Sequence, residues 1–248
     1  MYSDRPDFQE IIIEIESIIY EQVVLEQHEF IDSKIDDETG RQFWKENFLG
    51  KPTVSWHQFS VALGNFLVPT ISEDDMIIQC TQLVVAKEES VSISSFSLMC
   101  SWFGPLFREE NPPTMLLRVF DTFQIPSFHG VMSGLEAENI LKCHRPGSYL
   151  VRLSTRKKGC YCISVGTKDK QVVHFMYTYD TNTQKLKASK SPKTYPTLAH
   201  LISHHIAEKT LTPGLHIECT KYRWIFEDLS QMPSGYTDSN EMGFLRYD

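Results

Sequence analysis

The spacing of apolar and polar residues predicts helices through the first 110 residues and an α+β domain after about residue 127. Residues 7–30 are apolar on more than one face, so we expect a helix that packs on several sides. Turn residues separate the next apolar stretches, and a loose capping box at Ser72–Asp75 opens one of them. We expect the further helices over residues 41–49, 56–67, from Ser72 onward and 94–107.

In the second part of the chain, a capping box from Ser133 to Glu136 opens a short helix that runs through Cys143. Pro196, at a first helical position, opens a second helix. Apolar runs between the helices predict antiparallel strands over residues 148–154, 160–166 and 171–179, followed by a polar loop with a weak strand over 181–195. A helix, three strands and a helix form a small α+β sandwich.

The chain is long enough for two small domains. We expect a helical region over residues 1–115, a linker over 116–126 and the α+β domain over 127–229. Residues 230–248 show no clear periodicity, and we expect a mobile tail there.

The distribution of charge supports this division. Residues 1–120 carry 8 basic and 20 acidic side chains, a net charge of −12, whereas residues 121–248 carry 16 and 12, a net charge of +4. The basic half suits an anionic ligand, but it is not basic enough to predict a nucleic-acid partner. No apolar run approaches the length of a membrane span, so we expect no membrane partner.

Cysteine usage and the N-terminus favour a cytoplasmic protein. The six cysteines form no C-x-x-C pair, which is typical of a reduced protein without a disulfide framework. The first ten residues lack the basic and apolar regions of a signal peptide. We therefore expect the cytoplasm, or the cytosol of a host cell if a microbe secretes the protein.

Arg152 occupies an unusual position, in the middle of an apolar strand with Leu150, Val151 and Leu153 as neighbours. A buried guanidinium is costly without an anionic partner. No acidic residue occurs between Glu138 and Asp169, so a partner from outside the chain is expected.

The segment after this strand has the composition of a phosphate-binding loop. Ser154-Thr-Arg-Lys-Lys-Gly159 offers two hydroxyls, three cations and several backbone amides. Arginine forms bidentate hydrogen bonds to phosphate, whereas lysine acts as a point charge. A phosphate monoester is therefore the expected partner of Arg152.

The segment HGVMSGLEAENILKCHRPGSYLVRLSTRKKGCYCISV resembles the beginning of a Src homology 2 domain, and the resemblance extends over roughly residues 126–220. It implies that Arg152 lies at the floor of a phosphotyrosine pocket and that tyrosine-phosphorylated proteins or peptides are the partners. The implied phosphotyrosine-binding residues are Arg152, Ser154, Thr155, Arg156, Lys157, Lys158 and His174, and the implied peptide-specificity residues are Phe175, Met176 and Tyr177.

Two positions depart from the pattern of that family. Many members have an arginine early in the first helix that clamps the phosphate from the side, and here that position is Gly134. The lysine two residues after the strand histidine is replaced by Met176. Both departures thin the cation cluster, and we expect Arg156, Lys157 and Lys158 to compensate.

The stretches FWKENFLGKPTVSWHQFSVAL and SVSISSFSLMCSWFGPLFREE resemble the EF-hand-like unit that precedes the Src homology 2 domain in Cbl-type adaptors, and STAT proteins place a comparable helical linker there. A calcium loop requires Asp at its first position and a bidentate Glu at its twelfth. The candidate loop at 84–95 begins with Val84 and ends with Ser95, and one beginning at Asp36 would end at Asn47. We therefore expect no calcium, no other metal and no cofactor.

Other chemistries are weaker candidates. Cys143 precedes His-Arg-Pro-Gly, but a tyrosine phosphatase needs an arginine six residues after its cysteine, and residue 149 is Tyr; we expect Cys143 to be a core residue. His200 and His204 have the i, i+4 spacing of metal ligands but no third ligand, so we expect surface histidines. Kinase glycine-loop and D-F-G motifs are absent from the sequence.

These observations predict a protein that is not an enzyme but a phosphotyrosine-binding signalling adaptor. A scaffold with a vestigial pocket is one alternative. Another is dimerisation as in STAT proteins, through a phosphorylated tail tyrosine, with Tyr236 and then Tyr247 as candidates.

Overall fold

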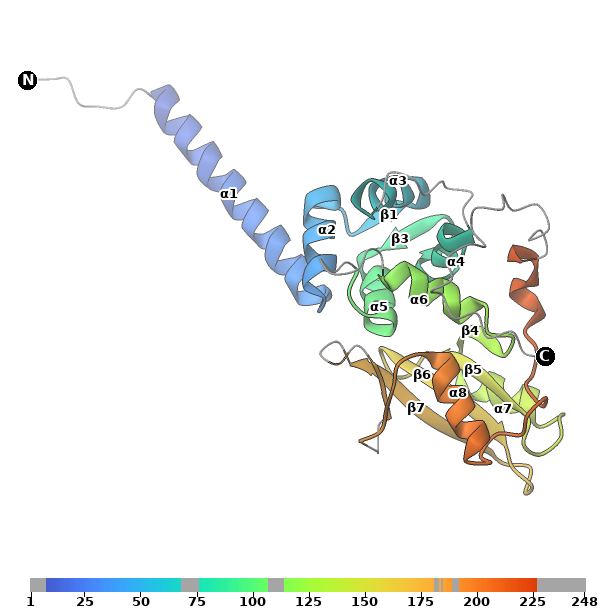
Figure 1. Cartoon of the computed structure of the whole chain (residues 1–248). Helices are drawn as coiled ribbons and strands as arrows, with labels where there is room; N and C mark the ends of the chain where they lie inside the picture. Colours follow the sequence, from blue (N-terminus) through green and yellow to red (C-terminus); the bar gives the residue numbers. More distant parts are fainter. Residues whose placement is uncertain are drawn as a thin grey trace, which may run out of the picture.

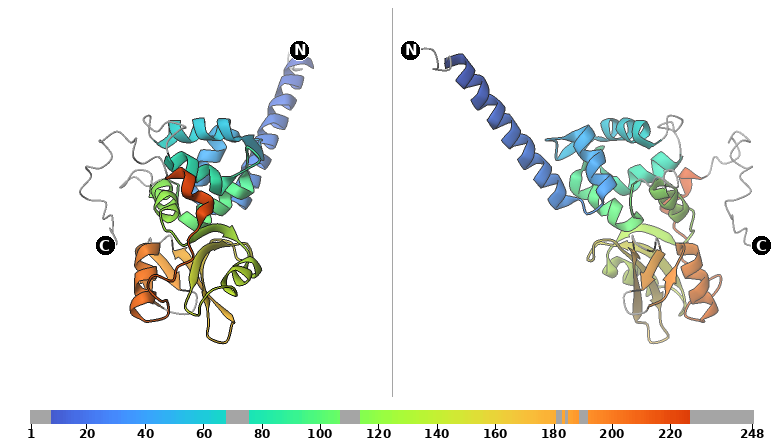
Figure 2. Two further views of the ribbon diagram at one scale, coloured as in Figure 1. Left: turned by 90° about the vertical axis from the view of Figure 1, so that its right-hand side faces the viewer. Right: turned by 60° about the vertical axis from the view of Figure 1, so that its left-hand side comes forward.

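The structure is a computed structural model of the chain, and it describes residues 8–67, 76–106, 114–180, 183, 185–188 and 192–226. A helical half lies against a half that contains a larger β-sheet (Figure 1). One long helix projects away from the helical half, and both views in Figure 2 show the same projection. No helix in the described part of the chain is both long and apolar enough to span a lipid bilayer.

The helical half is organised around a core of aromatic rings. Its helices are α1 (Phe8–Lys34), α2 (Glu38–Phe48), α3 (Trp56–Leu67), α4 (Met76–Val85), α5 (Ile93–Phe103) and α6 (Thr114–Phe123). The ring of Phe43 lies 5.7 Å from that of Phe59 and 5.6 Å from that of Phe96. Because these rings come from α2, α3 and α5, apolar burial joins three helices that are separate in the sequence.

A small antiparallel sheet connects the helical units in the order β1–β3–β2, with β1 (Thr53–Ser55), β2 (Ala86–Lys87) and β3 (Ser90–Ser92). The predicted remnant of a calcium loop at 84–95 therefore contains a β-hairpin, which turns at Glu88 and Glu89 with positive φ angles. The sequence pattern did not predict these strands because two or three residues are too few to show an alternation.

The second half is a mixed sheet with one helix on each face, as Figure 2 shows. The strands, in spatial order, are β4 (Phe128–Met132), β5 (Tyr149–Ser154), β6 (Cys160–Gly166), β7 (Val172–Asp180), β8 (Lys185–Ala188) and β9 (Thr194–Tyr195). The helices are α7 (Gly134–Leu141), α8 (Leu198–Ala207) and the short 3-10 helix η1 (Thr220–Ile225).

Strand alternation decides which helix covers which residues. Leu150 packs with Ala137 and Leu141 of α7, whereas Val151 belongs to the core that includes Leu201 of α8. The predicted architecture, a helical region followed by a sheet flanked by two helices, is confirmed.

The three predicted strands pair antiparallel, and an edge strand that the pattern did not predict, β4, pairs with β5 in parallel. Two details of the prediction were wrong. The helix expected from Pro196 begins at Leu198, because the side chain of Thr197 caps it by accepting from the backbone N–H of His200. Cys143, expected in the core, is exposed. The capping box at Ser72–Asp75 and the tail with Tyr236 and Tyr247 lie outside the described residues.

The two halves are in close contact along α5. Gly104, at φ +82°, lies so near the ring of Tyr179 that a Cβ there would be 2.4 Å from a ring carbon. Arg118 of α6 lies 4.8 Å from the centroid of the same ring and donates hydrogen bonds to the carbonyls of Phe103 and Pro105. A continuous apolar core crosses this junction.

Candidate functional site

Arg152 lies in the middle of β5, and only 4% of its surface is exposed. Its Nε donates to Ser164 Oγ at 3.2 Å, and its Nη1 donates to the carbonyl of Met132 at 2.9 Å. Within the described residues no carboxylate forms an ion pair with Arg152, and its Nη2 has no hydrogen-bond partner. A buried positive charge therefore keeps part of its donor capacity unused.

The residues around Arg152 are brought to one face of the sheet by strand register. Arg152 is paired with Cys162 of β6, and Cys162 is paired with Met176 of β7. Ser164 is likewise paired with His174. Because side chains alternate along a strand, these positions lie on the face that α7 covers. Met176, predicted as a peptide contact, lies on the Arg152 face and is 38% exposed.

A chain of hydrogen bonds sets the orientation of His174. Ser164 Oγ accepts from Arg152 and lies 2.8 Å from Nδ1 of His174. Ser164 Oγ thus links the guanidinium of Arg152 to the imidazole of His174. Nε2 on the far side of that ring lies 3.5 Å from a carboxylate oxygen of Glu138. Ser164 is wholly buried, whereas the side chains of His174 and Glu138 are partly exposed.

Gly134, the residue directly after the N-cap Ser133, lies close to Arg152 and His174. A Cβ at this position would be 3.7 Å from Arg152 Nη2 and 3.7 Å from His174 Nε2. The helix position at which many Src homology 2 domains have an arginine therefore lies close to Arg152. The absence of a side chain there leaves the two nitrogens facing the N-terminal turn of α7.

The loop between β5 and β6 is organised by a serine hydroxyl. Ser154 Oγ accepts from the backbone N–H groups of Arg156 at 3.3 Å and Lys157 at 3.1 Å. Ser154 is buried, whereas Thr155, Arg156 and Lys157 are exposed. The loop thus places two cationic side chains and a hydroxyl in solvent next to the buried Arg152.

Lys158 belongs to the same loop but is directed at the helical half. Its Nζ lies 3.0 Å from a carboxylate oxygen of Asp36, in the turn between α1 and α2, and 3.1 Å from Ser97 Oγ of α5. Gly159 follows at φ +67°, and a Cβ there would be 2.7 Å from the carbonyl oxygen of Ser101. The structure does not bring the ammonium of Lys158 to Arg152, which corrects the expectation that it joins the phosphate cations.

On the other face of β7, the predicted peptide-contacting residues differ in exposure. Phe175 is half-buried, and its ring centroid lies 5.0 Å from that of His205 in α8. Tyr177 is only 4% exposed, and its hydroxyl is hydrogen-bonded to Nε2 of His205. Tyr177 is thus a residue of the domain interior rather than of the peptide-facing surface, because its polar end is satisfied inside the protein.

Two cysteines complete the buried surroundings of Arg152. Hydrogen bonding with Cys160 and the positive charge of Arg152 lower the pKa of Cys162 to about 7. The hydrogen bond with Cys162 and burial raise the pKa of Cys160. Packing was the expected role of both cysteines, and both side chains are buried. The hydrogen bond with Cys160 is the main cause of the lowered pKa of Cys162, and the charge of Arg152 adds to it.

The residues proposed for other chemistries are not assembled into a second site. The thiol of exposed Cys143 lies 3.7 Å from the carbonyl of Asn139. His200 bonds to its helix cap Thr197, and His204 lies near Glu208. Within the described residues, no three side chains of the metal-binding types come together.

Sequence reasoning missed three contributors to the pocket: the carbonyl of Met132, the hydroxyl of Ser164 and the carboxylate of Glu138. Of the three, Ser164 could most easily have been identified from the sequence, because a serine two residues after Cys162 lies on the same face of the sheet as Arg152 when the two strands pair. The other two depend on how β4 and α7 lie over the sheet, which the pattern of residues does not specify.

Comparison with known families agrees with this geometry. The SH2 domain model matches residues 128–205. The model of the EF-hand-like domain from the Cbl proto-oncogene N-terminus matches residues 33–109. The chain therefore has one region similar to the Cbl-type EF-hand-like domain and another similar to the SH2 domain, and the predicted resemblance is confirmed.

Curated relatives include three from Dictyostelium discoideum, all named as dual specificity protein kinases. The kinase shkB is 30% identical over 181 residues, which are 71% of this chain and 26% of that protein. The kinase shkC is 30% identical over 64% of this chain and 33% of that protein, and shkA is 28% identical over 68% and 34%. The chain thus spans about a quarter to a third of these relatives. Their names contradict the expectation that the protein is not an enzyme.

Two solved structures also resemble the chain. The inactive choanoflagellate E3 ubiquitin ligase Cbl TKB covers 79% of this chain and 56% of its own, with 20% identity and a TM-score of 0.47. The SH2 domain of the Monosiga brevicollis CRK/CRKL homolog covers 33% of this chain and 74% of its own, with 27% identity and a TM-score of 0.30.

Proposed function

We propose that the protein captures tyrosine-phosphorylated partners through a pocket whose floor is Arg152. The observation that carries this proposal is the unused donor capacity of a buried guanidinium. Nη2 of Arg152 and Nε2 of His174 each lie 3.7 Å from the position that a Cβ of Gly134 would take, so both nitrogens approach one point beside α7. A phosphate supplies the anionic charge and the acceptor oxygen that Nη2 of Arg152 lacks among the described residues.

The surrounding loop supports the same ligand. Arg156 and Lys157 are exposed cations next to the pocket, and Thr155 adds a hydroxyl. The Ser154 hydroxyl orders the loop backbone through two hydrogen bonds before any ligand arrives, which lowers the entropy cost of binding. Arg156 and Lys157 then take the part that the missing helix arginine plays in other SH2 domains.

Depth favours phosphotyrosine over the shorter phosphoserine. Arg152 is almost fully buried at the floor, so a phosphate must be carried on a long side chain to reach it. Phe175 and the exposed part of Met176 remain the candidate contacts for the rest of the peptide. The proposed units are a helical region over 1–115 and an SH2 domain over 127–229.

The remaining parts of the proposal concern the cellular location of the protein and its partners. We place the protein in the cytoplasm, or in a host cytosol if it is secreted, because its described cysteines are all free thiols. Nucleic acid, membrane and calcium have no part in the proposed binding. If the whole protein has the activity named for its Dictyostelium relatives, the SH2 pocket would hold a kinase at tyrosine-phosphorylated partners.

The test is fluorescence anisotropy with a degenerate phosphotyrosine peptide library, its unphosphorylated twin and a phosphoserine version. We expect the full chain to bind only the phosphotyrosine peptides, and Arg152→Met to abolish that binding. Arg145→Met is the matched control, since Arg145 is exposed at the turn before β5. Binding that ignores phosphate or Arg152 would leave the scaffold with a vestigial pocket as the better account.

A further inference from the structure

Helix α1 exposes an unusual amount of apolar surface for a described part of a folded chain. Ile13 is 65% exposed, Ile18 is 59% and Tyr20 is 70%. The large apolar side chains of α1 that are at least 41% exposed are Phe8, Ile12, Ile13, Ile15, Ile18, Ile19, Tyr20, Val23, Leu25 and Phe30. Figures 1 and 2 show why: the helix leaves the body near its C-terminal end and continues alone.

A helix of this composition is ordinarily buried. Helices that are apolar on several faces belong to protein interiors, and isolated helices are marginal in water without tertiary packing. Contiguous exposed apolar patches beyond a few hundred Å² usually mark interaction sites. The N-terminal turns of α1 therefore form a binding surface rather than a solvated face.

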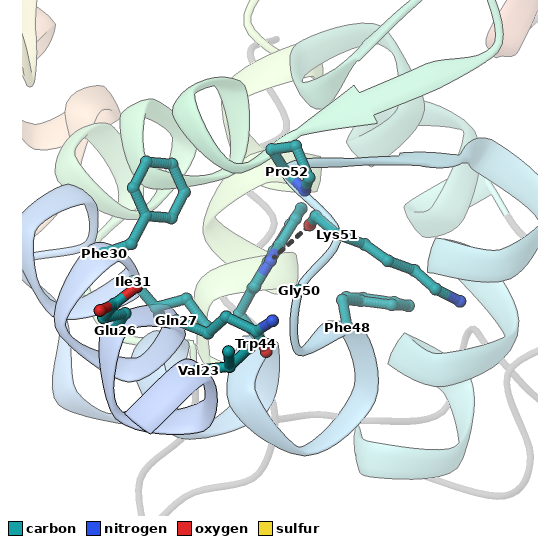
Figure 3. Close-up of a pocket in the computed structure, with 10 residues that line it drawn as sticks. All are labelled: Val23, Glu26, Gln27, Phe30, Ile31, Trp44, Phe48, Gly50, Lys51 and Pro52. Atoms are coloured by element: carbon teal, nitrogen blue, oxygen red, sulfur yellow. Dashed lines mark hydrogen bonds between the residues drawn. The ribbon is translucent and has the colours of Figure 1, made fainter. Parts of the chain in front are cut away.

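A groove at the base of α1 continues this surface into the body of the protein. It has a volume of about 300 Å³ and lies between Val23 and Phe30 of α1 on one side and Trp44 and Phe48 of α2 on the other. Figure 3 shows these side chains around the opening. The indole of Trp44 donates to the carbonyl of Lys51 at 3.1 Å, and this hydrogen bond fixes the orientation of the ring on the α2 side of the groove.

The charge of α1 indicates what covers it. Residues 8–33 contain seven carboxylates and neither lysine nor arginine. Asp32 is held by Lys45, at 2.6 Å, and by Arg41. Glu14, Glu16, Glu21 and Glu29 have no ion pair with any described residue.

These unneutralised acids argue against two occupants. Helices that lie on membranes carry lysine and arginine because lipid surfaces are anionic, and α1 has the opposite charge. A second copy of α1 would bring two sets of carboxylates together, and like charges across a helix interface are destabilising.

We propose that α1 and the groove at its base bind a helix of another protein that presents an apolar stripe flanked by lysine and arginine. The apolar stripe would cover the exposed isoleucines, and a large side chain near its end would enter the groove beside Trp44. The basic flanks would pair with Glu14, Glu16 and Glu21. This surface is separate from the phosphotyrosine pocket and does not depend on it.

The test uses the full chain and two labelled peptides of about 20 residues, long enough as helices to cover the exposed turns of α1. Both carry the same leucine stripe, and they differ only in having lysine or glutamate as flanking residues. We expect the lysine peptide to bind in an anisotropy titration, with an affinity that falls as salt rises, and the glutamate peptide not to bind.

Two variants of the chain assign the binding to α1. The double variant Ile15→Ser and Ile19→Ser should lower the affinity for the lysine peptide at least about tenfold. The triple variant Glu14→Gln, Glu16→Gln and Glu21→Gln should lower it by a similar factor. Leu135→Ser, at a residue 65% exposed on α7, is the matched control and should bind normally. Circular dichroism and phosphopeptide binding confirm that each variant folds.

Several results would overturn the proposal. Equal binding of both peptides would mean that charge does not select the partner. If neither peptide binds, a helix with an apolar stripe is excluded as the partner. Light scattering that shows a dimer, dissociated by the double Ile→Ser variant, would assign the surface to a second copy of the chain.

Discussion

Two arginines, one at the junction of the halves and one in the sheet, are set into the protein in different ways. Arg118 donates to two backbone carbonyls and lies against the ring of Tyr179. Arg152 is more deeply buried, yet within the described residues it has one carbonyl, one hydroxyl and no anion. Arg118 thus joins two structural units, whereas Arg152 is a buried charge without an anionic partner among the described residues, which is typical of a binding site.

The largest expected effect is the loss of phosphopeptide affinity when Arg152 is replaced. Arg152→Met removes the charge at the floor of the pocket and should cost about 2–5 kcal/mol of phosphopeptide binding, which is roughly 30-fold or more in Kd. Stability to urea should change little, because removal of an unpaired buried charge offsets the loss of the hydrogen bonds to Met132 and Ser164. Anisotropy and urea titrations measure both, with Arg145→Met as control. A parallel loss of stability and binding would make Arg152 a structural residue.

The second prediction is that Arg118→Met lowers stability and leaves phosphopeptide binding nearly unchanged, the opposite of Arg152→Met. Arg118→Met leaves the carbonyls of Phe103 and Pro105 without their donor and should lower the free energy of unfolding by about 1–3 kcal/mol. Phosphopeptide affinity of the folded protein should change little. Urea denaturation checks the first statement and anisotropy at low denaturant the second. If binding falls as far as in Arg152→Met, the junction and the pocket are one unit.

The third prediction concerns a cation added beside Arg152. Gly134→Arg places a new cation where a Cβ has ordinary contact distances to Arg152 Nη2 and His174 Nε2. Phosphopeptide binding should tighten about tenfold, since a hydrogen bond to a charged group contributes about 1.5–3 kcal/mol, offset by repulsion from Arg152. Leu135→Arg adds the same charge one residue away and should have a much smaller effect. Equal gains from both variants would indicate a general electrostatic attraction instead.

A pH titration examines the sheet on its other face. Burial and the charge of His204 lower the pKa of His205, whose neutral ring accepts from Tyr177. The unfolded chain therefore binds the proton at a higher pH than the folded chain, and stability should fall as pH drops below about 6.5. Urea midpoints at about pH 7.5 and about pH 5.5 measure this. His205→Gln should show a smaller difference between them; an unchanged difference would assign the effect to other groups.

The smallest expected effect concerns Lys158. Asp36→Asn breaks an exposed ion pair, which contributes little to stability, and frees an ammonium in the phosphate loop. Phosphopeptide affinity should rise by less than about twofold at low salt and not at all at high salt. Asp32→Asn makes the same change in charge but leaves Lys158 paired, and so should not raise affinity. A fall in affinity with Asp36→Asn would mean that the ion pair holds the loop in its binding conformation.

The second half was more predictable than the first because its signals are local. The strand that holds Arg152, the loop opened by Ser154 and the capping box at Ser133 are all visible within a few neighbouring residues. The absence of a side chain at Gly134 was also visible in the sequence, and the structure places this residue close to Arg152 and His174. In the helical half, strands of two or three residues and the hairpin at Glu88 carry too little pattern to be predicted.

The sequence by itself determined the longer helices and the three long strands and indicated that Arg152 would be buried without a local acid, because alternation and composition act over short distances. Only the tertiary structure decided that Lys158 binds Asp36, that Tyr177 faces His205 and that Ser164 links Arg152 to His174. These contacts join residues from 10 to 122 positions apart. Such pairs depend on how whole elements pack, and a side chain's own neighbours in the sequence carry no record of that packing.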